Sequence, residues 1–194
     1  IFFFDMAHGW ATWLWFLGLC VLGIGSAHGS DIFDLVRADD VESLRRRLTK
    51  DSDLLNKKEP GTGQTPLMAA TLAGAASVVE VLLEMGADHT IPEKDGYTPM
   101  HGAGFQGRWK VAQTLLKAGL DTSDRHMDGY TPLHRACWGT RKGHTQTVRV
   151  LLDHGVDIEE MDERGRTCLH MTQNDGTRKL IEKRLRQMRE KDDL

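Results

Sequence analysis

The chain has 194 residues, a formal net charge of −3 and 40% hydrophobic residues. This length is enough for one ordinary domain with a sizeable core, and the hydrophobic content excludes a disordered chain. The slightly acidic balance excludes the strongly basic composition that is typical of nucleic-acid-binding proteins.

An apolar segment opens the chain, and residues 10–27 carry no charged side chain. This run can form the apolar region of a secretory signal peptide, and the small residues at 25–27 suit signal peptidase. We therefore expect residues 1–27 to be a signal peptide that starts at Met6. Because no Lys or Arg precedes the run, two alternatives stay open: an uncleaved membrane anchor that leaves the rest of the chain in the cytosol, or an apolar tail without a targeting role.

Residues 31–60 begin with "DIFDLVRADDVESLRRRLTK", which predicts a first helix pair with Asp40 at the turn between the helices.

A repeat follows this first helix pair. The stretch "DGYTPMH" at residues 95–101 returns as "DGYTPLH" at residues 128–134, so that Thr98 and Thr131 lie 33 positions apart. Related stretches are "GTGQTPLMAA" at residues 61–70 and "ERGRTCLHMT" at residues 163–172. A fixed period of this size is typical of proteins built from stacked repeats.

Each copy predicts a helix start at its Thr. A Thr side chain is a good N-cap, and Pro99 and Pro132 occupy the first helical position, where a missing N–H costs nothing. His101 and His134 follow three residues after the Thr and can share a hydrogen bond with its hydroxyl. Second helices then carry apolar residues at helical spacing. They are Val78, Val79, Leu82 and Leu83, then Val111, Ala112, Leu115 and Leu116, then Val148, Leu151 and Leu152.

These motifs resemble the ankyrin repeat family, whose period is about 33 residues. The resemblance covers residues 31 to 191 and implies an all-α solenoid of stacked helix–turn–helix units with short β-hairpin-like fingers, preceded by the apolar leader. We expect an ankyrin domain at 28–191 and a tail at 192–194. The expected units are 31–61, 62–94, 95–127, 128–163 and 164–191. The basic final helix is expected to be a solvated cap.

No residues are assigned to catalysis, to a cofactor or to a metal. His101, His134, His144 and His170 belong to the repeat motifs, and no other set has the spacing of a zinc site or of a catalytic nucleophile. Cys137 and Cys168 fall on first helices of adjacent units. Helices stack roughly 10 Å apart, so we expect a Cα separation above the roughly 7 Å limit for a disulfide and two buried thiols.

The resemblance implies partner binding by finger tips and first helices. The expected partner-binding residues share these positions and are aromatic or basic: Tyr97, Phe105, Tyr130, Arg135, Trp138, Arg141, Lys142 and Arg166. Aromatic residues and Arg are enriched in binding hot spots. Two alternatives stay open: the aromatic residues only pad the stacked helices, and the extra "GTRK" between Trp138 and Gly143, which we place in the inter-helix turn, is neutral loop drift.

We therefore expect a monomeric, non-enzymatic scaffold that binds another protein and does not bind nucleic acid. An enzyme built on an ankyrin-like scaffold is a less favoured alternative, because no catalytic set of residues appears. The terminal "KDDL" resembles an endoplasmic-reticulum retrieval tetrapeptide, although a charge-rich tail can end this way by chance. Together with the leader it predicts the secretory pathway and the endoplasmic-reticulum lumen. The alternative is a regulatory domain anchored by residues 10–27, with membrane contact only in that case.

Overall fold

The computed structural model describes residues 31–192 of the chain. The predicted leader (1–27) and the last two residues of the KDDL ending lie outside this range. Within it, no helix is both long enough and apolar enough to cross a membrane.

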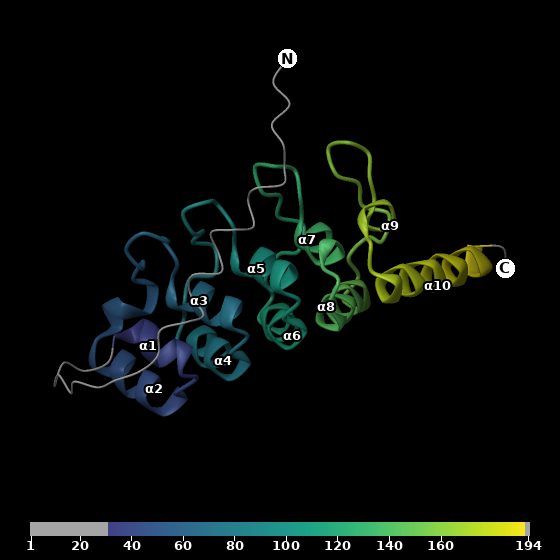
Figure 1. Ribbon diagram of the computed structural model, residues 1–194. Helices are drawn as coiled ribbons and strands as arrows, with labels where there is room; N and C mark the ends of the chain where they lie inside the picture. Colours follow the sequence, from purple (N-terminus) through teal and green to yellow (C-terminus); the bar gives the residue numbers. More distant parts are fainter. Residues whose placement is uncertain (1–30, 193–194) are drawn as a thin grey trace, which may run out of the picture.

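The described residues form paired helices without a β-strand, as the all-α prediction requires. The first helix of each pair lies in one layer and the second helix in the other, and loops project from the first layer in a common direction (Figure 1). The pairs are α1 (Ile32–Arg37) with α2 (Val41–Lys50), α3 (Pro66–Ala73) with α4 (Ala76–Glu84), α5 (Pro99–Gln106) with α6 (Trp109–Lys117), α7 (Pro132–Trp138) with α8 (Lys142–Asp153), and α9 (Cys168–Met171) with α10 (Asp175–Asp192). A short 3-10 helix, η2 (Ser52–Asn56), follows α2.

The first helices begin at Thr residues, as the sequence predicts. The side chain of Thr65 accepts a hydrogen bond from the N–H of Met68, three residues on. In the next unit the hydroxyl of Thr98 lies 2.8 Å from Nδ1 of His101, and Thr131 and His134 repeat this contact at 2.8 Å. The Thr–His pairs satisfy polar groups that would otherwise be unpaired at a buried helix start.

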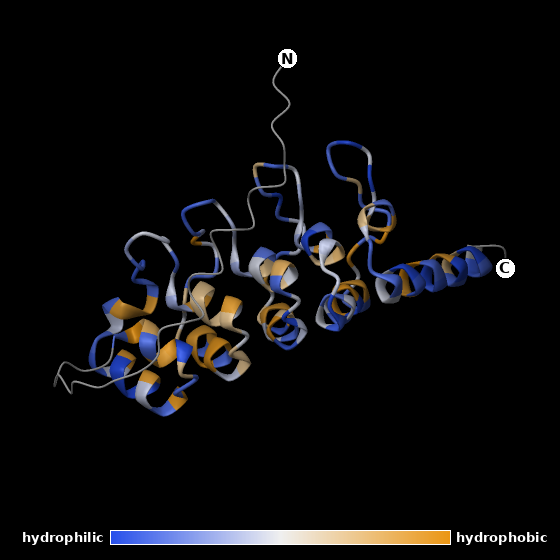
Figure 2. Ribbon diagram, viewed as in Figure 1, coloured by the Kyte–Doolittle hydropathy of each residue, from blue (hydrophilic) through white to orange (hydrophobic). Residues whose placement is uncertain are grey.

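The core is a continuous apolar layer between the two rows of helices. Val78, Val79 and Leu82 of α4 and Val111 of α6 are at most 1% exposed. Apolar colouring concentrates on the inward sides of the helices, whereas the projecting loops and α10 are mainly hydrophilic (Figure 2). A buried Val or Leu side chain stabilises the fold by about 1.5–3 kcal/mol, and each unit obtains this burial from its neighbours.

Two local predictions are wrong by a few residues. The three extra residues of the fourth unit do not stay in the turn, because α8 spans 12 residues where α6 spans 9, so the insertion lengthens α8 at its start. In the first unit Asp39, with φ of 54°, takes the place of the turn glycine. Asp40 instead caps α2 by accepting a hydrogen bond from the N–H of Ser43.

Cys137 and Cys168 form a disulfide with a Cα separation of 5.5 Å, so the prediction of two separate thiols is wrong. Cys137 is the sixth residue after its cap Thr, and Cys168 is the first residue after the next one. In the preceding two first helices, α5 and α7, the equivalent positions are Gly104 and Pro132. These two residues also lie close together, because a Cβ on Gly104 would be 2.5 Å from the Pro132 carbonyl oxygen. Successive first helices are therefore staggered so that the end of one meets the start of the next. This axial offset brings the two cysteines together, although the roughly 10 Å spacing of stacked helices predicts that they stay apart.

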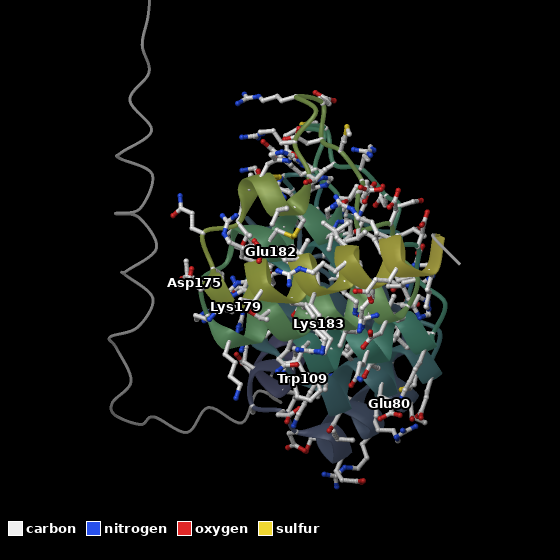
Figure 3. All side chains as sticks on the ribbon, turned by 90° about the vertical axis from the view of Figure 1, so that its right-hand side faces the viewer. Glu80, Trp109, Asp175, Lys179, Glu182 and Lys183 are labelled. Atoms are coloured by element: carbon white, nitrogen blue, oxygen red, sulfur yellow. A yellow bond between two sulfur atoms is a disulfide. The ribbon has the colours of Figure 1, made fainter. Side chains whose placement is uncertain are left out.

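The last helix, α10, packs against α8 through its first half. Leu180 and Ile181 are buried, Leu185 is half-buried, and Met188 is 45% exposed. Figure 3 looks at this end of the array, with Lys179, Glu182 and Lys183 on the exposed side of α10. The burial of the apolar side chains decreases toward the end of the helix.

Candidate functional site: the finger cavity and the arginine cluster

Each projecting loop is a tight, hairpin-like finger. In the finger between the second and third units, the N–H of Glu93 donates to the carbonyl of Tyr97, and the N–H of Gly96 donates back to the carbonyl of Glu93. The φ of Gly96 is 89°, a left-handed value that favours glycine. The finger between the third and fourth units repeats this pattern with His126 and Tyr130. The fingers therefore place Tyr97 and Tyr130 at equivalent positions directly before the first helices.

Arg135 connects the two tyrosines to Trp138. Its guanidinium carbon lies 4.7 Å from the ring centroid of Tyr97, 5.1 Å from that of Tyr130 and 4.8 Å from that of Trp138. Tyr130 and Trp138 also meet edge to face, with centroids 4.6 Å apart. Asp128 forms an ion pair with Arg135. We call these five residues the arginine cluster.

The cluster compensates its own charges. One guanidinium nitrogen of Arg135 donates to the hydroxyl of Tyr97 at 2.8 Å and to the carboxylate of Asp128. Burial acts to raise the pKa of Asp128, but hydrogen bonds from His126 and Arg135 outweigh burial and hold that pKa below its usual value. Because Arg135 is only 5% exposed, its main structural role is to fix the aromatic side chains around it.

A second, similar contact joins the fourth and fifth units. Arg166 donates to the hydroxyl of Tyr130 at 2.7 Å and to the carboxylate of Asp162 at 2.9 Å. Arg166 thus holds one finger against the next, as Arg135 does one unit earlier.

Beside the arginine cluster lies a cavity of about 430 Å³, which we call the finger cavity. Its lining residues come from two fingers and from three first helices, α3, α5 and α7. Those used below are Met68, Leu72, Glu93, Tyr97, Gly102 and Phe105, and Arg135 of the cluster lines it as well. The volume lies in the range of about 300–1,000 Å³ that is typical of small ligand sites.

Gly102 helps to keep the cavity open. It occupies the position that Arg135 takes in the next unit, four residues after the cap Thr. A Cβ at Gly102 would lie 3.1 Å from Cε of Met68 and 3.2 Å from Cδ2 of Leu72. Any larger side chain there would extend into the space that these two residues border.

Glu93 is one of two carboxylates of the cavity wall, and the other, Asp95, is exposed. Its carboxylate is half-buried and accepts a hydrogen bond from the side-chain amide of Gln64 at 3.2 Å. Burial raises the pKa of Glu93, and the nearby charge of Asp95 acts in the same direction. The site therefore combines an apolar hollow with the half-buried carboxylate of Glu93.

The remaining residues of the predicted surface are placed as follows. Phe105 is 55% exposed and lines the finger cavity, and Trp138 is 39% exposed and belongs to the arginine cluster. Arg141 donates to the carbonyl of Gln106 at the end of α5, and Lys142 is exposed at the start of α8. The structure thus brings Tyr97, Phe105 and Arg135 around one cavity and connects Tyr130 and Trp138 to it through Arg135. The binding role of these residues stays a prediction.

Sequence reasoning missed Glu93, Gly102 and Asp128. An alignment at the 33-residue period places Glu93 with His126 and Gly102 with Arg135, so it shows that the residue type changes at both positions. Chain position alone did not indicate which of these residues would face a cavity.

The repeat histidines hold structural contacts. Nε2 of His101 lies 3.2 Å from the carbonyl of Tyr130, and Nε2 of His144 lies 2.9 Å from the carbonyl of Phe105. Burial lowers the pKa of both rings, which therefore favour the neutral form. Across residues 31–192, no group of three or more His, Cys, Asp or Glu side chains is arranged to hold a metal ion.

Comparison with known families agrees with the geometry. The family model described as ankyrin repeats (3 copies) matches residues 35–126, and the one described as ankyrin repeat matches residues 128–163. A search of curated proteins found no match to the chain. Ankyrin repeats generally mediate binding to other proteins, so the fold is that of an interaction scaffold. With helix pairs, capping threonines and fingers in the positions described above, the chain belongs to the ankyrin repeat family.

Proposed function

We propose that this protein is a non-catalytic scaffold that binds a partner protein over the finger cavity and the arginine cluster, in the lumen of the secretory pathway. One observation supports the proposed binding surface. Phe105 and Trp138, at equivalent positions of adjacent units, are 55% and 39% exposed beside a cavity of about 430 Å³. Large aromatic side chains next to a hollow are the usual anchors of a protein interface.

The compartment is proposed on separate grounds. The Cys137–Cys168 disulfide joins two buried side chains across two units. Structural disulfides persist in oxidising compartments and are rare in the cytosol, where thiols are kept reduced. The disulfide therefore favours the luminal hypothesis over a membrane-anchored domain that faces the cytosol.

The compartment can be tested on the protein isolated from its own cells. Alkylation before reduction, followed by mass spectrometry, reports both the mature N-terminus and the state of the two cysteines. A start near His28 and no alkylated Cys137 or Cys168 support the lumen. A retained leader with both thiols alkylated supports the cytosol-facing anchor and would refute the luminal proposal.

The binding surface can be tested by comparing variants of the full protein. Proteins that co-purify with the wild type should be lost with Phe105→Ala, because an aromatic anchor contributes on the order of 2 kcal/mol, or about 30-fold in affinity. Trp109→Ala is the matched control, since Trp109 on α6 is 37% exposed and lies far from the fingers (Figure 3). Equal retention with both variants would contradict binding at this surface.

A further inference from the structure

One finger position recurs in four successive units, and three of its four residues are acidic. The backbone N–H groups of Glu59, Glu93, His126 and Asp162 each donate to the carbonyl of the residue before a cap Thr. These four side chains can be compared directly, because each residue occupies the same backbone position in its finger.

Two of the three carboxylates at this position have an arginine partner within the chain. Glu59 pairs with Arg37, and Asp162 pairs with Arg166 at 2.8 Å. Two further finger acids, Asp128 and Glu160, also pair with arginines. At this position the rule is therefore an ion pair with an arginine, whereas Asp95 and Glu163 elsewhere in the fingers form no ion pair within residues 31–192.

Glu93 departs from this rule. Its carboxylate accepts a hydrogen bond from the neutral amide of Gln64 at 3.2 Å, and within residues 31–192 no Lys, Arg or His nitrogen forms an ion pair with it. Its carboxylate is half-buried and lines the finger cavity. A partly desolvated carboxylate without a cation gains considerably from a charge-assisted hydrogen bond.

The walls of the cavity suit the rest of a basic side chain. Tyr97 and Phe105 contribute aromatic surface, while Met68 and Leu72 contribute apolar surface next to Gly102. Lys and Arg bury their aliphatic stems on such surface and are attracted to aromatic rings. The two cations of the lining are Lys94, which is exposed, and Arg135, whose charge is paired with Asp128. The cavity thus offers each part of a Lys or Arg side chain a matching contact.

We propose that the finger cavity accepts a Lys or Arg side chain of the partner protein, whose cationic group binds the carboxylate of Glu93 while its stem lies against Tyr97 and Phe105. This inference rests on the proposed function, namely that the finger side of the array binds a protein. A peptide is favoured over a free small cation because Phe105 and Trp138 remain exposed beside the cavity and can hold the residues that flank the basic one.

The test selects binders from a library of random peptides on the immobilised full protein. Peptides enriched by the wild type should share a Lys or Arg at one position. Replacing that residue by Ala should weaken binding about tenfold or more, and Glu93→Gln should weaken binding of the unchanged peptide to the same extent. Combining Glu93→Lys with a peptide in which the basic residue is Glu should restore binding.

A matched control separates this site from general electrostatic attraction. Glu80→Gln removes an exposed carboxylate on α4, far from the fingers (Figure 3), and should leave peptide affinity unchanged. An equal loss with Glu80→Gln would overturn the inference. Competition by spermidine as effective as competition by the selected peptide would also overturn it, in favour of a site for small cations.

The failure of the inference can be told apart from the failure of the proposed function. Enriched peptides that need Phe105 but share no basic residue would overturn the role of Glu93 and leave the surface as a protein-binding site. Enrichment no better on the wild type than on Phe105→Ala would overturn both.

Discussion

Reduction of the Cys137–Cys168 disulfide is expected to lower the free energy of unfolding by about 3.7 kcal/mol. The bond closes a loop over a sequence separation of 31 residues. In the chain-entropy relation, a loop of this size removes about 12 cal/mol/K from the unfolded ensemble, or about 3.7 kcal/mol at 25 °C. Because α9 has only four residues, the bond adds a covalent link to the packing of Leu180 and Ile181 that holds the last unit to the array.

The assay is urea unfolding of the full protein, with and without reductant, followed by far-ultraviolet circular dichroism. With an m value of about 2 kcal/mol/M, the midpoint should fall by about 2 M urea on reduction. Repeats contact only their neighbours, so hydrogen exchange should accelerate in α9 and α10 more than in α3 and α4.

The double variant Cys137→Ala/Cys168→Ala is the control and should match the reduced wild type with or without reductant. An unchanged wild-type midpoint on reduction would refute the entropic reasoning. Two alkylatable thiols in the unreduced, denatured protein would refute the bond itself.

Three further outcomes follow from the packing. Trp138→Ala should weaken partner binding more than tenfold at little cost in Tm, because Trp138 is 39% exposed. The control Trp109→Ala should change neither partner binding nor Tm. If Trp138→Ala unfolds the protein, Trp138 belongs to the packed core. Gly104→Ala should lower the free energy of unfolding, measured by thermal denaturation, by about 1–3 kcal/mol, since the new Cβ would lie 2.5 Å from the Pro132 carbonyl oxygen. Gly102→Ala should change that free energy by less than about 0.5 kcal/mol, because only flexible side chains face Gly102. Similar effects of the two variants would count against the close stacking of α5 and α7. Burial lowers the folded-state pKa of three histidines, so the unfolded chain binds protons at a higher pH than the folded chain does. The free energy of urea unfolding should therefore fall from about pH 7.5 to about pH 5.5, by up to about 1.4 kcal/mol per pH unit for each ring. A constant or rising free energy of unfolding over this pH range would contradict this. These histidines are His101, His134 and His144.

Most of the fold could be predicted from local chemistry, because the same capping and turn residues recur in several units. Thr98 and Thr131 mark helix starts wherever they occur, since capping is decided within one turn of the chain. Gly74 and Gly107 end first helices with φ of 85° and 67°, left-handed values that glycine adopts without strain. Periodicity then fixes which side of each second helix is buried.

The sequence could also propose which residues share a surface, because equivalent positions of stacked units lie side by side. Tyr97 with Tyr130, and Phe105 with Trp138, follow from the 33-residue period alone. What these residues contact could not be predicted this way. Arg135 was predicted for the partner surface, whereas the residue is only 5% exposed and its guanidinium lies among three aromatic rings.

The tertiary structure alone decided the contacts between units. The stagger of α7 and α9 brings Cys137 to Cys168, although a spacing estimate made from parallel helices separates them. The same packing leaves Glu93 without a cation while pairing its counterpart Asp162 with Arg166. The physical reason is one of range: caps, turns and helix faces depend on residues a few positions apart, whereas disulfides, buried charges and cavities depend on atoms that only the stacking of whole units brings together.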